Sequence, residues 1–578
     1  MQRRLGALAS GAEKPSLVAS GVMLGAAKDD GGLAVLLFSR AKILQGDLGC
    51  AQNDLWAVRL GREGGPEILL RALWKGVTPK GRLLCAPVNQ AASEYLESHR
   101  SRRLCTTSLT LCCGAFGELL QVGALRADPK RAAVLQSTSP ASASLPELPE
   151  LQGLSEEQRE VARRVAAWCD GAQGCVPVRG VFGSGKSRTL AACIVLLDRL
   201  LSERKDPRRI VLLCQTNVAV DGVLLRLLNH GWDRFARLGS FKAMAPQLLS
   251  CGAGLAKERK ALVKDFSEAL KHQVGLDEPT AQALRQSVER GELPPRPSVW
   301  RKRRVLATTL AALEAADHLG EALRCPLVLV DEAAQLTEPQ LFAALSRVSA
   351  ECVLLLGDPR QLPPRAAHSS LQLSALARLP PQLELTTQFR CHPDIGELCS
   401  QLFYGGRLKS GVSKEARGSV LGPNHSALAV VLSQGLECRV GQSFRHDAEA
   451  RLCTAWLLQA RASSLRAQDF GIICLYRAHA EACASAARAG DLQVEAATVD
   501  AFQGGEREVI ALCCGRSSPV SGDSFTCCPF RLLVALCQPW SRARRHVVIF
   551  GTESFLSSHP IFSQILAFAA AKGAVVRP

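Results

Sequence analysis

The segment Gly180–Ser187 limits what this chain can fold into more than any other feature, because it has the spacing G-x-x-x-x-G-K-[ST]. An apolar stretch, Val176–Val181, enters it and is predicted to be a strand, and Lys186–Leu201 is predicted to be the helix that leaves it. In such a loop, glycines let backbone N–H groups turn toward phosphate oxygens, and the helix N-terminus adds a partial positive charge. A chance glycine-rich turn is the alternative, and the flanking strand and helix argue against it.

The residues of this loop have expected tasks toward ATP and Mg²⁺, the two cofactors that the motif predicts. Lys186 is expected to reach the β- and γ-phosphates, and Ser187 is expected to bind Mg²⁺. The remaining phosphate contacts are expected from the backbone of Gly180, Gly183, Ser184 and Gly185.

Two acidic residues, Asp331 and Glu332, directly follow the apolar stretch Leu327–Val330. A carboxylate at a strand end beside a phosphate-binding loop can hold Mg²⁺, and a second one can activate the attacking water. We therefore predict that Asp331 is the metal residue and Glu332 the general base. Alone, such an acidic pair usually lies in a solvated turn, so the prediction depends on the buried strand that precedes it.

A third segment, Gly357–Pro364, also follows a predicted strand, Val353–Leu356. Gln361 within it could bond the γ-phosphate or the attacking water and so sense hydrolysis. A proline-rich surface loop is the alternative, and the position at a strand end favours the functional reading.

Strand and helix patterns alternate from Leu154 onward, which predicts an α/β fold with parallel sheets. Further strands are expected at Ile210–Cys214, Val305–Thr308, Ala427–Leu432, Phe470–Leu475, Val494–Thr498, Val509–Cys514 and Val547–Phe550. We predict a β-rich N-terminal region (1–135), a Ser/Pro/Glu-rich linker (136–150) and two α/β domains in tandem (151–378 and 379–578). Residues 241–303, charged and helix-prone, are expected to be an inserted subdomain of the first α/β domain.

The charge and the cysteines bear on partners and compartment. Lys and Arg number 70 against 53 Asp and Glu, a net charge of +17, which favours a polyanionic partner such as nucleic acid. An arginine-rich, GC-rich coding sequence would give the same surplus.

The 23 cysteines include the doublets Cys112-Cys113, Cys513-Cys514 and Cys527-Cys528, which lack the C-x-x-C spacing of a zinc site. Scattered free thiols predict a reducing compartment.

No uncharged apolar run reaches the ~18 residues of a membrane span. The apolar stretch within Met1–Lys14 is too short for a secretory signal. We expect no membrane partner and a nuclear or cytosolic location. The basic run Arg301–Arg304 is either a nuclear localisation signal, a phosphate-contacting patch, or a solvated lead-in to the next strand.

These motifs, with others in the same order, resemble the superfamily 1 helicases from about residue 150 to 551. Further matching segments are Leu154–Gln158, Thr216–Asp221, Arg237–Ser240, Ala307–Thr309, Gln388–Pro393 and Thr498–Glu506. The resemblance implies two tandem RecA-like domains with ATP bound between them and single-stranded or tailed nucleic acid lying across both.

The resemblance also implies residue roles. Around ATP, it implies that Gln158 reads adenine, Phe389 stacks on the base, Arg390 reaches the γ-phosphate and Glu506 joins the ribose or phosphate network. The residues implied for nucleic-acid contact are Thr216, Asn217, Thr308, Thr309 and Thr498.

Within that superfamily the segments Asp331–Gln335 and Gln388–Pro393 look like the branch that includes Senataxin, Aquarius and the nonsense-mediated-decay helicase, which moves 5′→3′. Gly180–Gly183, Phe389–Pro393 and Asn53–Val58 look most similar to the helicase region of the GRF-type zinc-finger DNA helicases. This implies a DNA substrate, genome maintenance and the nucleus. An RNA helicase or ribonucleoprotein remodeller of the same branch is the alternative.

The last motif departs from the family pattern R-L-N-V-A-L-T-R-A-[KR]-R-H. Leu533 stands in place of its Asn, and four extra residues, Cys537–Trp540, precede Arg542. Arg542 is the residue that the motif implies as the arginine finger. A proline-containing insertion beside it could displace that guanidinium, so an ATPase-impaired scaffold that binds nucleic acid is a second alternative.

Overall fold

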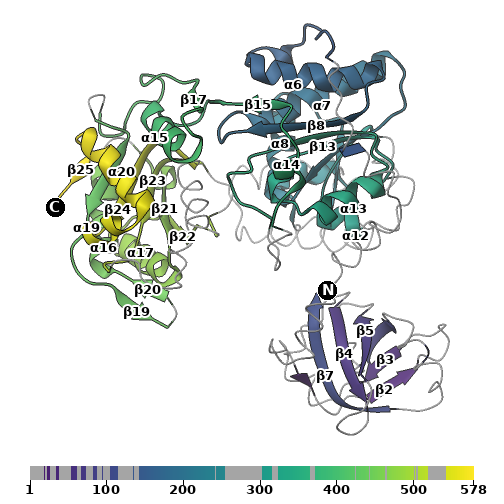
Figure 1. The fold of residues 1–578 in the computed structure, drawn as a ribbon, viewed down its shortest axis with the longest axis horizontal. Helices are drawn as coiled ribbons and strands as arrows, with labels where there is room; N and C mark the ends of the chain where they lie inside the picture. Colours follow the sequence, from purple (N-terminus) through teal and green to yellow (C-terminus); the bar gives the residue numbers. More distant parts are fainter. Residues whose placement is uncertain are drawn as a thin grey trace, which may run out of the picture. The chain divides into compact units, whose positions relative to one another are not determined.

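The computed structural model describes the chain in segments and in two compact units, Met1–Asp128 and Pro129–Pro578, which are treated separately (Figure 1). The described residues are 18–19, 23–26, 34–37, 54–60, 67–72, 82–87, 94, 104–114, 134–135, 142–240, 243–253, 303–315, 323–364, 372–422, 425–441, 443–461, 465–499, 501–502, 506–518 and 542–578. Among these residues, no helix combines the length and apolar character that crossing a bilayer requires.

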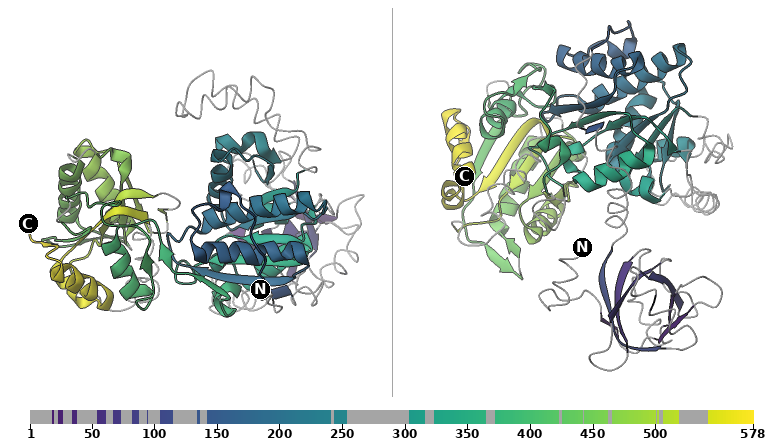
Figure 2. Two further views of the ribbon diagram at one scale, coloured as in Figure 1. Left: turned by 90° about the horizontal axis from the view of Figure 1, so that it is seen from above. Right: turned by 45° about the vertical axis from the view of Figure 1, so that its right-hand side comes forward.

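The first unit is an antiparallel sheet, as the β-rich prediction for the N-terminal region requires. Its seven strands are β1 (Val18–Ala19), β2 (Met23–Ala26), β3 (Ala34–Leu37), β4 (Asp54–Leu60), β5 (Glu67–Ala72), β6 (Arg82–Pro87) and β7 (Leu104–Gly114). Their order is β1-β7-β2-β3-β6-β5-β4, and an additional pairing of β4 with β7 closes the sheet into a barrel (Figure 2, right). Closure removes free sheet edges, which explains how so few short strands form one unit.

The second unit begins with the domain that carries the phosphate-binding loop, built on an eight-stranded sheet in the order β11-β10-β12-β9-β13-β14-β8-β15. Every pairing in it is parallel. The strands are β8 (Gly174–Gly180), β9 (Ile210–Cys214), β10 (Phe235–Leu238), β11 (Gly252–Ala253), β12 (Val305–Thr309), β13 (Leu327–Val330), β14 (Cys352–Gly357) and β15 (Leu383–Leu385).

Helices cover both faces of this sheet, which is why its strands read as continuous apolar runs. One face packs against α6 (Glu156–Ala166), α7 (Lys186–Glu203) and α8 (Asn217–Asn229), and the other against α12 (Leu310–Ala315), α13 (Glu338–Val348) and α14 (Ala375–Arg378) (Figure 1). Alternate residues of one strand serve the two cores: Leu212 faces the first and Val211 the second.

A second parallel sheet, in the order β22-β21-β23-β24-β18-β25, forms the last domain. Its strands are β18 (Leu428–Leu432), β21 (Phe470–Cys474), β22 (Glu495–Thr498), β23 (Arg507–Cys513), β24 (Ala543–Gly551) and β25 (Val575–Val576). Helices α15 (Pro393–Phe403), α19 (Glu553–Ser558) and α20 (Pro560–Ala571) pack on one face, and α16 (Asp447–Arg461) and α17 (Arg477–Ala489) on the other. Short pairs, β16 (Thr387–Gln388) with β17 (Lys409–Ser410) and β19 (Cys438–Val440) with β20 (Ser443–Arg445), complete it.

Three domain borders differ from those predicted. The chain divides after Asp128, and Leu135 and Leu148 are buried in the cores of the first α/β domain, so the predicted linker 136–150 is partly packed. Strand β11 pairs with β10, so Gly252–Ala253 of the predicted insertion belong to the sheet, and residues 254–302 lie outside the described residues. Strand β15 pairs with β8, which carries the first domain past residue 378 to Leu385.

Candidate active site

The phosphate-binding loop joins β8 to α7 and has a conformation that only glycine tolerates at two positions. Gly183 and Gly185 have φ angles of 66° and 78°, in the left-handed region. A Cβ atom on Gly185 would lie 2.4 Å from Gln158 Nε2, and one on Gly183 would lie 2.8 Å from Arg390 Cβ. The glycines therefore allow the loop to be touched from both α/β domains.

Lys186 is buried beneath this loop and has only neutral partners there. Its Nζ donates to the carbonyl oxygens of Gly180 (3.0 Å) and Val181 (3.1 Å). Ser184 braces the same turn, since its hydroxyl donates to the Val181 carbonyl at 2.7 Å. No acidic residue stands in the first turn of α7, so no side-chain charge there would repel an anion from its N-terminal N–H groups and Lys186. This arrangement fits a polyphosphate.

Asp331 follows β13 and comes near Ser187 across the sheet edge. Ser187 Oγ donates to Asp331 Oδ2 at 3.4 Å, which brings together a hydroxyl and a carboxylate, the oxygen ligands that suit Mg²⁺. Burial, helped by the neighbouring Glu332, raises the pKa of Asp331 to about 7, and Lys186 acts in the opposite direction. The pair fits the predicted metal role.

Glu332 has a backbone conformation that is unusual for its residue type. Its φ is 52°, in the left-handed region, and its N–H donates to Asp331 Oδ1 at 2.9 Å. Strained backbone of this kind costs about 1–3 kcal/mol and concentrates at functional sites. The unusual backbone at Glu332 is therefore consistent with a functional role for this residue.

Gln361 has its amide engaged with an acidic neighbour. Its Nε2 donates to Asp358 Oδ2 at 3.0 Å, and the Tyr404 hydroxyl donates to the same oxygen at 2.6 Å. Arg360 lies over the Tyr404 ring, 5.1 Å from its centroid. Tyr404 belongs to the second α/β domain, so this loop links the two domains. Sequence reasoning named neither Asp358 nor Tyr404, although Asp358 stands three residues before Gln361.

Gln158 is engaged within the protein in this structure, and its role in reading adenine stays a prediction. Its Oε1 accepts from the Ser155 N–H (3.0 Å), its backbone N–H donates to Ser155 Oγ (3.3 Å), and its Nε2 donates to the Ser184 carbonyl (2.7 Å). Gln158 is 3% exposed. The amide that was expected to read adenine therefore caps α6 and supports the phosphate loop in this structure, because burial makes those partners obligatory.

The second α/β domain brings arginines to the loop. Phe389 N–H donates to the Gly183 carbonyl at 2.9 Å, and Arg390 Nη2 pairs with Glu506 Oε1 at 2.6 Å. Burial lowers the pKa of Arg542, and Arg390 lowers it further, whereas Glu332 and Glu506 oppose that shift. Glu332 is thus the first-domain carboxylate whose charge acts on Arg542. The insertion Cys537–Trp540 lies outside the described residues.

Phe389 is half-buried and packs against Gly411. A Cβ atom on Gly411 would lie 2.3 Å from the Phe389 ring, so glycine is the residue that admits the ring there. Beside it, a pocket opens at the start of the phosphate loop. Its lining combines both domains: Arg179, Gly180, Val181, Asp358, Pro359, Arg360, Glu384, Leu385, Thr386, Tyr404, Arg407 and Leu408.

Thr216 and Asn217 lie at the N-terminus of α8. The Thr216 hydroxyl accepts from the Ala219 N–H at 3.2 Å, so it caps the helix. Asn217 Oδ1 accepts from Arg237 Nη2 at 2.6 Å, and Arg237 also pairs with Asp221 at 2.9 Å while fully buried. Both predicted contact residues are half-exposed at a helix N-terminus, which suits a phosphate.

Three further predicted contact residues have different surroundings. Thr308 is 1% exposed and donates to the Leu238 carbonyl at 3.1 Å, so its position argues against a direct contact with nucleic acid, because the strand β12 buries it. Thr309 is also buried, and its hydroxyl accepts from the Ala312 N–H at 3.2 Å. Thr498 is half-buried at the end of β22. A sequence motif alone does not tell an inward side chain from an outward one.

Comparison with known proteins bears on this geometry. Two family models, both described as AAA domain, match residues 252–367 and 369–554, together more than half of the 578 residues. The 5′–3′ DNA helicase ZGRF1 of Mus musculus is 33% identical over 415 residues, covering 67% of this chain and 22% of that protein. The ATP-dependent helicase upf1 of Schizosaccharomyces pombe is 28% identical over 478 residues, covering 76% of this chain and 49% of that protein.

The chain thus spans less than half of the length of these relatives. Among solved structures, the PRRSV helicase covers 95% of this chain with 14% identity, and its TM-score of 0.37 is too low to support an argument.

Proposed function

Because the chain belongs to the superfamily 1 helicases, we propose that it is an ATP-dependent 5′→3′ helicase or translocase that moves on nucleic acid, with DNA as the favoured substrate. The observation that carries the proposal is the convergence on one phosphate loop of carboxylates from the first RecA-like domain and arginines from the second. A site divided in this way responds to domain movement, which is what converts hydrolysis into stepping.

Different residues of the chain have different roles in the proposed reaction. Lys186 and the N–H groups of the loop bind the phosphates, and Ser187 and Asp331 would hold Mg²⁺. When bound, Mg²⁺ neutralises phosphate charge and ATP supplies the transferable phosphoryl group. Glu332 accepts the proton of the attacking water.

Arg390 and Arg542 stabilise the charge that develops on the phosphoryl group. In the present arrangement Arg390 is held by Glu506, so engaging a phosphate requires Arg390 to leave that ion pair. Glu506 would then retain Arg544, which lies 3.8 Å away. This exchange of partners supports Arg390 as the residue that senses the nucleotide from the second domain.

Nucleic acid would lie across the N-terminus of α8 in the first domain and the end of β22 in the second. Thr216, Asn217 and Thr498 are the contact residues that we favour, and backbone contacts of this kind bind either DNA or RNA. The preference for DNA rests on the similarity to a relative named a DNA helicase, while several other relatives are named regulators of nonsense transcripts.

A nuclear location belongs to the same proposal. Of the basic run Arg301–Arg304, Arg304 pairs with Asp198 at 3.3 Å and so is held within the fold. Arg301 and Lys302 lie outside the described residues. Nuclear accumulation of the tagged chain, lost when Arg301 and Lys302 are both replaced by Ala, would support the signal. A uniform distribution of the unaltered chain would contradict it.

The test is ATP hydrolysis by the purified chain with matched single-stranded DNA and RNA, followed by unwinding of duplexes with 5′ or 3′ tails. We expect stimulation that is larger with DNA, and unwinding of 5′-tailed duplexes only. Lys186→Ala must abolish the activity. Hydrolysis without unwinding of either duplex would indicate a remodeller. Absence of hydrolysis with every nucleic acid, despite binding, would indicate an ATPase-impaired scaffold and remove the motor function.

A further inference from the structure

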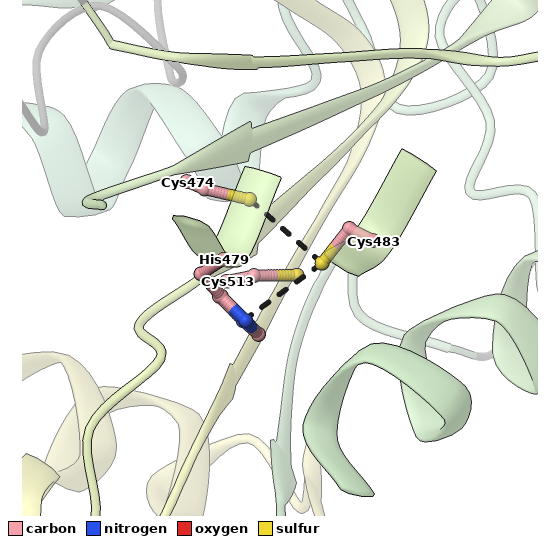
Figure 3. A group of neighbouring side chains, drawn as sticks. All are labelled: Cys474, His479, Cys483 and Cys513. Atoms are coloured by element: carbon pink, nitrogen blue, oxygen red, sulfur yellow. Dashed lines mark hydrogen bonds between the residues drawn. The ribbon is translucent and has the colours of Figure 1, made fainter. Parts of the chain in front are cut away.

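We propose that Cys474, His479, Cys483 and Cys513 form a structural zinc site in the core of the second RecA-like domain. Figure 3 shows the four side chains pointing toward one another. None of them is a predicted nucleotide or nucleic-acid residue, so the proposal stands apart from the motor function.

The fold brings these four residues together from two strands and one helix. Cys474 is the last residue of β21 and Cys513 the last of β23, and the two are partners in the parallel register. His479 and Cys483 lie four residues apart in α17, on the same face of the helix. The carboxyl ends of two neighbouring strands and one turn of a covering helix thus supply all four donors.

The distances between donor atoms suit a tetrahedral ion. All four donor atoms lie within 4.8 Å of one another, Cys474 Sγ is 3.8 Å from Cys483 Sγ, and Cys483 Sγ is 3.8 Å from His479 Nε2. A tetrahedral zinc with Zn–S bonds of about 2.3 Å places its sulfurs about 3.8 Å apart. A small contraction of the longer separations would close the site.

The chemistry of the donors indicates zinc and a structural role. Three sulfurs and one imidazole nitrogen form the Cys₃His set that is common in structural zinc sites, which use four protein ligands and leave no open position. All four side chains are buried, as such a closed site requires. Among the residues that the structure describes, no other group of three or more His, Cys, Asp and Glu side chains converges in this way.

Zinc binding would displace protons from the four donor groups, and the residues around His479 show which hydrogen bonds would remain. His479 Nε2 now lies 2.9 Å from Glu449 Oε1, and zinc at that nitrogen would replace the proton between them. Glu449 would keep two donors, since the Gly515 N–H donates to Oε1 at 2.9 Å and Ser433 Oγ donates to Oε2 at 3.3 Å.

The plain alternative is that these cysteines are small apolar residues filling the core. Several buried cysteines elsewhere, such as Cys193 and Cys325, fill cores in this way without converging donors. Cys453 lies close by, with its thiol hydrogen-bonded to that of Cys513. It is the natural control because it is buried in the same core but is not one of the four converging donors.

The ion would lie next to the strand that leads into Thr498–Glu506, one of the segments that match the helicase motifs. Cys474 pairs with Thr498 in the register, and the Val499 N–H donates to the Cys474 carbonyl at 3.3 Å. Zinc at Cys474 would therefore fix the strand end that leads from Thr498 toward Glu506.

The test is the metal content of the full chain purified without chelators. We expect about one zinc per chain, lost in Cys483→Ser and in Cys513→Ser and retained in Cys453→Ala and Cys325→Ala. Cobalt added to the zinc-stripped chain should give thiolate-to-cobalt charge-transfer absorption and the intense bands of tetrahedral cobalt. This readout needs no substitution, so misfolding of a variant does not remove it.

Three results would overturn the proposal: no zinc in the unaltered chain together with no thiolate–cobalt absorption, undiminished zinc in Cys483→Ser, or a Cys474–Cys483 disulfide found by mass spectrometry in metal-free protein. Loss of ATPase activity would leave the proposal standing, because zinc content and cobalt absorption are measured independently of hydrolysis.

Discussion

At the scale of single residues, the phosphate loop is held by hydrogen bonds from outside it, one from a side chain and one from a backbone N–H. Gln158 supports the loop from α6, and Phe389 supports it from the second domain through the Gly183 carbonyl. The loop thus has its shape before nucleotide arrives, which lowers the entropic cost of binding.

Replacing Gln158 by Ala removes the capping box of α6 and the bond to Ser184 together. We expect a loss of about 1–2 kcal/mol in the free energy of unfolding, because a cap and a buried hydrogen bond are lost. The KM for ATP should rise as the loop loosens. Denaturant unfolding and ATPase kinetics check this. Gln152→Ala, an exposed glutamine just before the helix, should change neither, and an unchanged KM in Gln158→Ala would contradict the supporting role.

Replacing Glu332 by Gln keeps the shape of the side chain and removes the base. We expect kcat to fall by about 10²–10⁴, the usual contribution of a general base, with nucleotide affinity within a few fold. Steady-state kinetics and nucleotide binding separate the two effects. Glu338→Gln in α13 serves as the control, and a fall in affinity without a fall in kcat would exclude the assigned role.

At the scale of elements, two buried side chains fix how strands and helices meet. Arg237 in β10 ties that strand to α8 through Asp221 and Asn217, and His546 in β24 is enclosed between Trp456 and Ser419. Folding must keep the Arg237 cation paired and must leave the buried His546 without a proton.

Replacing Arg237 by Met leaves the Asp221 carboxylate buried without its cation. We expect a loss of about 3–5 kcal/mol in the free energy of unfolding, as is typical for removing one partner of a buried ion pair. Arg199→Ala breaks an exposed pair with Glu203 and should cost less than about 1 kcal/mol. Equal losses in the two variants would show that burial does not determine the strength of the Arg237 pair.

Stability should depend on pH through His546. Burial lowers its pKa to about 3 from the ordinary 6.5. Between these two pKa values, His546 is protonated in the unfolded chain but not in the folded chain. The free energy of unfolding therefore decreases as pH falls below about 6.5. At pH 5.5 this amounts to about 1.4 kcal/mol relative to neutral pH.

The difference between the unaltered chain and His546→Leu isolates this contribution, since the other groups titrate in both. Denaturant unfolding at pH 7.5 and 5.5 should show the larger loss in the unaltered chain. The same pH dependence in both proteins would indicate that the imidazole is protonated in the folded state.

Most of the helices and strands could be predicted from the sequence, because their buried residues form recognisable apolar patterns. Ile210–Cys214 and Leu327–Val330 are strands as predicted, because both faces of a parallel sheet demand unbroken apolar runs. Strands β11 and β15 were missed because two or three residues carry no pattern. The convergence of Cys474 with Cys513 depends on strand register, and only the spacing of Cys474, His479 and Cys483 was visible in the sequence.

At the scale of the whole molecule, the central feature of the proposed function is one nucleotide site shared by two RecA-like domains. The order of the motifs predicts this division, because each motif follows its own strand. The contacts that join the halves could not be predicted. Glu157 of α6 accepts hydrogen bonds from the Thr386 N–H (3.0 Å) and hydroxyl (2.6 Å), which fixes the connection just before Gln388. That link joins residues far apart in the sequence, and no motif predicts that Glu157 and Thr386 are partners.

The most direct test of the shared site is ATP hydrolysis by Arg390→Ala, compared with Arg477→Ala, an exposed arginine on α17 of the same domain. Nucleic-acid-stimulated kcat and nucleotide affinity would be measured for both variants and the unaltered chain. We predict that Arg390→Ala lowers kcat by about 10³ or more, as loss of an arginine finger does, while nucleotide still binds to the first domain and Arg477→Ala behaves as the unaltered chain. A kcat for Arg390→Ala equal to that of the unaltered chain would contradict the account, because hydrolysis would then not need the arginine that the second domain places against the phosphate loop.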